Sequence, residues 1–171
     1  MNNYNWFDAE KALRLLERKM SSDQKKPTLY HCVRTASLLF YFDCSYETQI
    51  SWILHDLLED TDTEEQEISK YFWNSVLNIV KENSKDRSLP KDKMLEDLIM
   101  RCCEWGIEST SVKVANLYDN FCFYLKTQND IEIERCKYLA WLVLKYVKPQ
   151  GANKIFKYLI SIMNYKFSLN D

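Results

Sequence analysis

Glycine and proline are scarce in this sequence, which contains 2 Gly and 3 Pro among 171 residues. Tight hairpins use both residues, whereas the interiors of helices exclude them. The shortage therefore argues against a β-rich fold and favours an all-α protein. A chain of this length corresponds to one domain, and we expect residues 1–171 to form a single domain.

The chain also lacks an excess of basic residues, a long apolar run and a cationic leader. Lys plus Arg is 23 and Asp plus Glu is 25, which gives a net charge of −2, so we expect no nucleic-acid partner. The longest apolar stretches, such as Tyr138 to Leu144, are far shorter than the roughly 18 residues of a membrane span. We therefore expect a cytoplasmic protein without a membrane partner.

The six cysteines form no recognisable metal-binding or disulfide pattern. None stands in a C-x-x-C pair, and no pair of histidines accompanies them at zinc-finger spacing. They are expected to be free thiols in a reducing compartment. Apolar residues make up 46% and aromatic residues 14% of the chain, which is enough to bury a core and excludes a disordered protein.

Apolar residues recur at helical spacing along almost the whole chain, and they predict about eight helices and no strand. Thr63-Glu-Glu-Gln66 has the form of a capping box, Gly106 is a plausible helix C-cap, and Ser109 or Thr110 can begin the next helix. The expected helices cover approximately residues 6–20, 30–42, 46–59, 63–79, 91–106, 109–126, 130–148 and 152–165.

The chain contains two histidines, and His55 begins the cluster H-D-L-L-E-D in an otherwise apolar helix. On a continuous helix, His55 and Glu59 lie one turn apart, as do Asp56 and Asp60. Buried charges are costly unless they are paired or bound to a metal. The cluster is therefore either a metal site or the solvated end of the helix.

Imidazole and carboxylate together are a ligand set that suits Mn²⁺, Fe²⁺, Zn²⁺ or Ni²⁺. A divalent ion in such a site lowers the pKa of water and polarises a phosphoryl oxygen. Further carboxylates nearby can accept the proton of that water. The residue types in this cluster thus suit metal-assisted hydrolysis.

Five segments occur in an order that is typical of one enzyme superfamily. They are KKPTLYH ending at His31, ILHDLLEDT at 53–61, TEEQEISKYFWNSV at 63–76, DRSLPK at 86–91 and VKVANLYDN at 112–120. Together they resemble the HD-domain superfamily of metal-dependent phosphohydrolases. The closer resemblance is to its alarmone-hydrolase branch, which comprises the hydrolase domain of Rel/SpoT proteins and small stand-alone enzymes. The similarity covers roughly residues 6–147.

The resemblance implies an all-α HD-domain helical bundle with a metal centre. His31, His55 and Asp56 match the positions of the family's metal ligands. Glu59 and Asp60 match the residues that position or deprotonate the attacking water.

The resemblance also implies a substrate. The family removes the 3′-pyrophosphate of guanosine tetra- or pentaphosphate with Mn²⁺, by attack of water. Lys25 or Lys26 would face the base or the phosphates, and Asn120 would bind the ribose or phosphate end. The implied activity is that of a guanosine-3′,5′-bis(diphosphate) 3′-pyrophosphohydrolase, which uses Mn²⁺ or another divalent transition metal.

Asn116 departs from the family pattern, because the fourth metal ligand of the family is an aspartate at this position. An amide oxygen can bind a cation but brings no negative charge. Three interpretations follow: Asn116 is a weak ligand, Asp119 one turn later replaces it, or the protein binds a nucleotide without turnover. Trp73 also stands where the family usually has glycine.

Two alternatives to alarmone hydrolysis therefore stay open. One is an HD phosphohydrolase that acts on another nucleotide, such as a nucleoside monophosphate or a nicotinamide dinucleotide phosphate. The other is a catalytically impaired, nucleotide-binding regulator. In addition, the stretch from Lys154 to Phe167 alternates lysine with apolar residues, so it can dock on the domain or on a second copy in a homo-oligomer.

Overall fold

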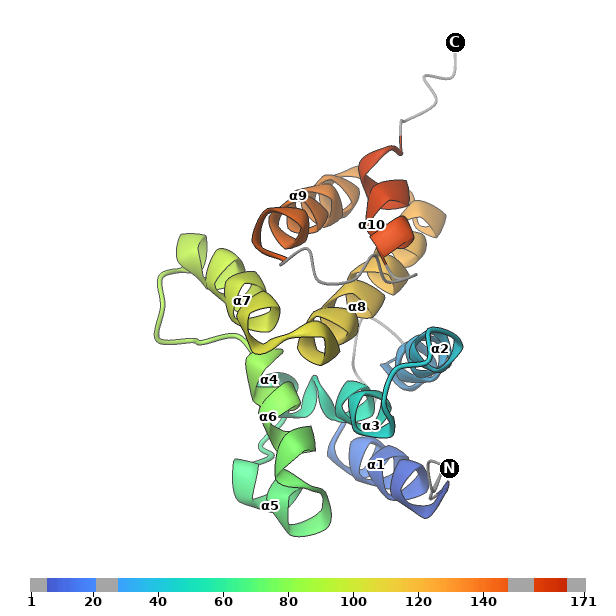
Figure 1. The fold of residues 1–171 in the computed structure, drawn as a ribbon, viewed down its shortest axis with the longest axis vertical. Coiled ribbons are helices and arrows are strands. Elements are labelled where there is room, and N and C mark those ends of the chain that lie inside the picture. The colour runs from blue at the N-terminus through green and yellow to red at the C-terminus, as the bar shows by residue number, and fades with distance from the viewer. Residues whose placement is uncertain (1–5, 21–27, 148–155, 166–171) are drawn as a thin grey trace.

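The structure is a computed structural model that describes residues 6–20, 28–147 and 156–165 (Figure 1). Within these ranges the chain forms ten helices and no strand, which confirms the expected all-α class. In chain order they are α1 (Trp6–Lys19), α2 (Thr28–Tyr41), α3 (Tyr46–Leu54), α4 (Leu57–Asp60), α5 (Glu65–Tyr71), α6 (Asn74–Glu82), α7 (Lys91–Trp105), α8 (Ile107–Lys126), α9 (Asp130–Tyr146) and α10 (Phe156–Met163).

The longest helix, α8, is the centre of the fold. It contacts α2, α3, α6, α7, α9 and α10, and Figure 1 shows it crossing between the α7–α9 side and the α2–α3 side of the molecule. Every residue from Ser109 to Ala115 is buried, as expected for a helix that is covered all round. The small side chains in this stretch allow neighbouring helices to approach closely.

The expected helix over residues 46–59 is interrupted at the H-D dipeptide, so its predicted continuity is wrong. Helix α3 ends at Leu54 and α4 begins at Leu57. At the end of α3, the backbone N–H of His55 donates to the carbonyl of Trp52, and His55 Nδ1 donates to the same carbonyl at 2.7 Å. His55 and Asp56 therefore lie at a junction, where adjacent side chains can face the same side.

The expected helix over residues 63–79 is also two helices. Phe72 and Trp73 have extended backbone conformations between α5 and α6, which turns the chain between the two. The predicted capping role of Thr63 is wrong as well. Glu64 occupies the cap position, and the Thr63 hydroxyl hydrogen-bonds to that of Thr61 at 2.7 Å.

Gly106 ends α7 and immediately precedes α8. Its φ of +134° is a conformation that L-residues with a side chain rarely adopt, so the predicted glycine C-cap is confirmed. Helix α8 begins at Ile107, and Ser109 and Thr110 lie inside it rather than at its start. The expected end of one helix at residue 148 and start of the next at 152 lie outside the described residues.

The described helices enclose one apolar core, in which Trp52 is the largest fully buried side chain. All six cysteines are free thiols, as expected, and four of them are buried. Among the described residues, no helix combines the length and the apolar character that crossing a membrane requires.

Candidate metal centre

Histidine 31 reaches the centre of the molecule from the N-terminal part of α2. Its side chain is 3% exposed. Its ring makes a T-shaped contact with Trp52, with 5.0 Å between ring centroids. The Trp52 indole N–H in turn donates to the carbonyl of Cys32 at 2.8 Å, which ties α3 to α2 next to this histidine.

His55 is held on one face of the same tryptophan. Its ring stacks on Trp52, with 3.9 Å between centroids and 19° between planes. Because a carbonyl oxygen only accepts, the hydrogen bond to the Trp52 carbonyl requires the proton on Nδ1. In the neutral ring, Nε2 therefore has the lone pair and is the atom of His55 that could bind a metal.

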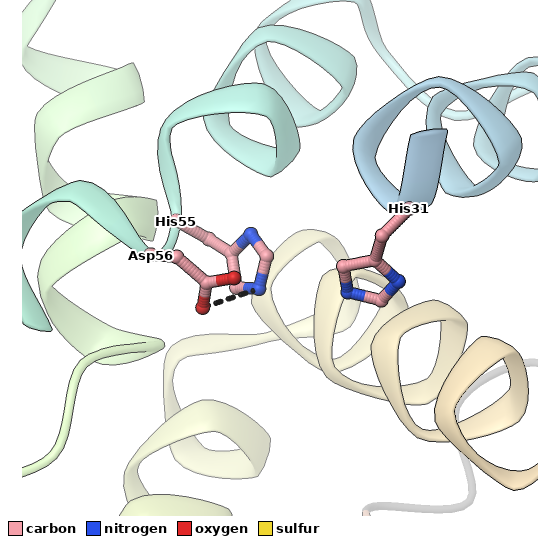
Figure 2. A group of neighbouring side chains, drawn as sticks. All are labelled: His31, His55 and Asp56. Carbon is pink, nitrogen blue, oxygen red and sulfur yellow. Dashed lines mark ion pairs between the residues drawn. The ribbon is translucent and has the colours of Figure 1, made fainter. Parts of the chain in front are cut away.

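His31, His55 and Asp56 converge, as the sequence pattern predicts. One ligand atom from each of the three lies within 4.8 Å of the others, although His31 comes from α2 and the other two from the junction of α3 and α4. Figure 2 shows both imidazoles and the carboxylate turned towards a common point. The chain's two histidines thus share one site with a carboxylate.

The geometry at Asp56 suits a cation. Asp56 Oδ1 lies 2.8 Å from His55 Nε2, and two lone pairs this close need a proton or a metal ion between them. Burial alone would raise the pKa of the Asp56 carboxyl, but His55 and His31 hold that pKa below its ordinary range. The carboxylate is therefore ionised and available as a ligand.

Helix α8 brings Asn116 to the same point. Its Nδ2 lies 3.0 Å from His55 Nε2, and its Oδ1 accepts a hydrogen bond from Asn120 Nδ2 at 2.5 Å. Asp119 lies elsewhere: it contacts His31 Nδ1 and the guanidinium of Arg34. Of the two candidates for a fourth ligand, Asn116 is the one next to His55.

Glu59 and Asp60 follow on α4 and have different surroundings. Glu59 accepts from the backbone N–H of Lys85 at 2.7 Å and from its Nζ at 2.5 Å. Asp60 lies at the rim of the site, where partial burial and the nearby carboxylates of Asp56 and Glu59 raise its pKa. Glu59 is thus fixed by a cation, whereas the raised pKa of Asp60 suits this carboxylate to accept a proton.

The cluster opens into a cleft of about 550 Å³ between α4, α7, α8 and α9. Its lining includes His31, Asp56, Glu59, Asp60, Asn116 and Asn120, together with Lys85, Lys113, Glu132 and Arg135. The predicted residues Lys25 and Lys26 lie outside the described residues. All other predicted site residues except His55 line the cleft, and His55 lies directly behind Asp56.

Lys113 is a cleft residue to which the sequence analysis assigned no role. Its side chain is buried, its Nζ donates to the backbone carbonyl of Asn83 at 3.4 Å, and its charge contributes to the low pKa of Asp56. Valines at 112 and 114 flank it. A lysine inside an apolar helix segment is the signal that could have identified it.

Comparisons with known proteins agree with this geometry. The sequence profile described as "HD domain" matches residues 9–97. A guanosine-3′,5′-bis(diphosphate) 3′-pyrophosphohydrolase, MESH1 of Drosophila melanogaster, is 24% identical over 61% of this chain and 59% of its own length. The Xenopus tropicalis MESH1 is 32% identical over 44% of this chain and 43% of its own. The aligned part of the chain thus spans less than two thirds of the length of these relatives.

Solved structures extend the likeness over most of the chain. A metazoan SpoT orthologue described as hydrolysing ppGpp has a TM-score of 0.73 at 20% identity, covering 94% of this chain and 96% of its own. The Listeria monocytogenes protein lmo0812 has a TM-score of 0.67 at 17% identity, covering 85% and 96%. These similarities establish a common fold. With the matched profile and the convergent histidines, they identify the chain as a member of the HD-domain family.

Proposed function

We propose that this protein is a divalent-metal-dependent hydrolase that removes the 3′-pyrophosphate of guanosine 3′,5′-bis(diphosphate). The observation that carries the proposal is the convergence of His31, His55 and Asp56 beside a cleft that also contains cationic side chains. The MESH1 relatives and the SpoT orthologue, with the activities in their names, support this choice of substrate.

The donor set fits a divalent transition metal, for which we propose Mn²⁺. His31, His55 and Asp56 would hold the ion. Asn116 would add a fourth ligand through Oδ1, once its amide has rotated to exchange Oδ1 for the Nδ2 that lies next to His55, because an amide nitrogen is a donor. When bound, the ion supplies positive charge that polarises a phosphoryl oxygen and lowers the pKa of water.

The two carboxylates of α4 would then have different roles towards the attacking water: Asp60 accepts its proton, and Glu59 positions it. Asp60, with its raised pKa, takes the proton as the water attacks the 3′-linked phosphorus. Glu59 accepts two hydrogen bonds from Lys85, which hold its carboxylate in place, and it would orient the attacking water. The bond between that phosphorus and the ribose 3′-oxygen breaks and pyrophosphate is released. The proton that Asp60 took passes to the 3′-oxygen, which leaves guanosine 5′-diphosphate.

The cations of the cleft suit a substrate with several phosphates. Lys85 lies next to Glu59, Lys113 is close to Asp56, and Arg135 projects from α9 on the opposite wall. Charge-assisted hydrogen bonds to phosphate oxygens are among the stronger polar contacts. Asn120 is placed to bind the ribose or phosphate end, and we retain Lys25 and Lys26 as contacts to the base or phosphates.

A second function is favoured by one observation, the amide at position 116. Without the negative charge of an aspartate, the site holds a dication less tightly, and a nucleotide-binding protein without turnover is the outcome if the ion is lost. For either function we propose a cytoplasmic location, which the six free thiols support.

The test is a product analysis with purified protein and Mn²⁺. Guanosine tetra- and pentaphosphate, nucleoside monophosphates and a nicotinamide dinucleotide phosphate are incubated separately, and the products are identified by mass spectrometry. We expect pyrophosphate together with guanosine 5′-diphosphate or 5′-triphosphate. Release of inorganic phosphate from another nucleotide would indicate the broader HD phosphohydrolase. Binding of the tetraphosphate without any product would indicate the regulator.

A further inference from the structure

Asp119 was considered above as a replacement metal ligand, but its carboxylate lies on the outer side of His31. Its Oδ2 contacts His31 Nδ1. Figure 2 shows one ring nitrogen of His31 facing His55 and Asp56, and the other turned away from them. Asp119 therefore approaches the metal centre only through the imidazole of His31.

Arg34 fixes the carboxylate of Asp119 from the other side. The guanidinium donates from Nε to Oδ1 at 2.6 Å and from a terminal nitrogen to Oδ2 at 2.9 Å. Arg34 lies one turn after His31 on α2, so both side chains project from the same face towards α8. A bidentate pair of this kind restrains the carboxylate in position and in orientation.

This arrangement determines which nitrogen of His31 is the ligand. An ionised carboxylate only accepts hydrogen bonds, so the ring nitrogen that faces Asp119 carries the proton. In the neutral ring the lone pair is then on Nε2, the nitrogen that faces His55 and Asp56. Carboxylates behind metal-binding histidines fix the tautomer in this way and make the imidazole a better donor.

We propose that Asp119, held by Arg34, is a positioning residue that keeps His31 in the tautomer and orientation required for metal binding. The proposal rests on the metal centre of the proposed function. It also bears on Asn116: the chain lacks a carboxylate at that ligand position but has one a turn later, acting through His31. The uncharged amide of Asn116 thus lies next to His55, and the negative charge of Asp119 lies behind His31.

The first measurement reads the tautomer directly and uses no metal. With two histidines in the chain, long-range ¹⁵N–¹H spectra contain two imidazole patterns, which a His55→Gln variant assigns. At pH of about 8, well above the usual imidazole pKa, we expect His31 to carry its proton on Nδ1. In Asp119→Ala, a large fraction should carry the proton on Nε2.

The second measurement is Mn²⁺ affinity by titration calorimetry. We expect Asp119→Ala to weaken binding by about 10- to 100-fold, the range for residues behind a metal ligand. Asp119→Asn should be intermediate because its Oδ1 still accepts from Nδ1. Arg34→Gln should weaken binding by about two- to five-fold, since its side chain is half-exposed.

Asp8→Ala is the matched control. The Asp8 side chain is 9% exposed and paired with Lys11 on α1, compared with 10% for Asp119, and it does not line the cleft. Equal affinities and an unchanged His31 tautomer in the Asp119 and Asp8 variants would overturn the proposal.

If the unsubstituted protein itself fails to bind Mn²⁺, the proposed function is wrong, while the tautomer spectra still decide the role of Asp119. If Asp119→Ala does not fold, Asp119→Asn and Arg34→Gln decide in its place.

Discussion

Two walls enclose the candidate metal centre, and they differ in how they use charge. The wall formed by α2, α3 and α4 provides His31, His55 and Asp56, whose ligand atoms point at one another. The wall formed by α8 provides Asn116, a neutral amide next to His55, and Asp119, a carboxylate that reaches the centre only through His31.

The two walls correspond to two requirements of a metal site, which are to attract the ion and to set how tightly it is held. The first wall supplies a convergent set with one ionised carboxylate, which is sufficient to attract a dication. In the proposed site, the second wall would adjust how tightly the ion is held, through the uncharged side chain of Asn116 next to His55 and the charged side chain of Asp119 behind His31. Changes in the first wall should therefore remove binding, whereas changes in α8 should tune it.

The largest effect is expected from Asp56→Asn, which gives the first wall the neutral character of Asn116. Loss of its carboxylate should weaken Mn²⁺ binding by more than about 100-fold, beyond the range for residues that only support a ligand, and should abolish turnover together with the ion. Titration calorimetry measures the affinity, and circular dichroism of the metal-free variant verifies folding.

The double variant Asp56→Asn, Asn116→Asp restores the charge on the opposite wall. If its Mn²⁺ affinity equals that of the unsubstituted protein, the walls are interchangeable and the distinction between them fails.

An intermediate effect is expected from Asp60→Asn, which changes the first wall without touching a ligand. Turnover should fall by about 10²- to 10⁴-fold, the usual contribution of a general base, while Mn²⁺ affinity stays the same. An ordinary carboxyl group has a pKa of about 4. Because the pKa of Asp60 is raised above this value, its ionised, basic form needs a higher pH. As the pH is lowered, turnover of the unsubstituted enzyme should therefore begin to fall while the pH is still above the ordinary carboxyl pKa. The pH–rate profile of the variant should lack this decline.

Glu132→Gln is the control for Asp60, because Glu132 also lines the cleft but pairs with Arg135 on α9. Equal losses of turnover in the two variants would assign the effect to the charge of the cleft rather than to proton transfer.

The smallest effect is expected from Asn116→Asp, which gives the second wall a charged ligand. Mn²⁺ affinity should rise by about ten-fold, equivalent to roughly 1.4 kcal/mol. Asn120→Asp introduces the same charge one turn further along α8. A gain of equal size in both variants would mean that the added negative charge attracts the ion from a distance and that residue 116 is not a ligand.

The sequence was sufficient to predict the class of fold and the convergence of the two histidines. The scarcity of glycine and proline and the helical spacing of apolar residues reflect local preferences, which a sequence contains directly. The HD-family pattern supplied the long-range information that His31 and His55 meet, because no local rule relates positions so far apart in the chain.

The sequence could not reveal the break between α3 and α4 or the surroundings of Asp119. The break depends on one carbonyl, that of Trp52, which both the backbone and the ring of His55 contact. Helical spacing alone favours a continuous helix there. The position of Asp119 depends on Arg34, a residue of another helix, and such a pairing exists only once α2 and α8 have packed.

Trp52 gives this molecule an optical probe of its own centre. Its indole is fully buried and stacks on His55, whereas Trp73, Trp105 and Trp141 are each about half exposed. Among tryptophans whose side chains are described, the short-wavelength part of the emission therefore belongs to Trp52. A paramagnetic ion bound by the neighbouring imidazole will quench that component first, so occupancy can be followed by fluorescence without any label.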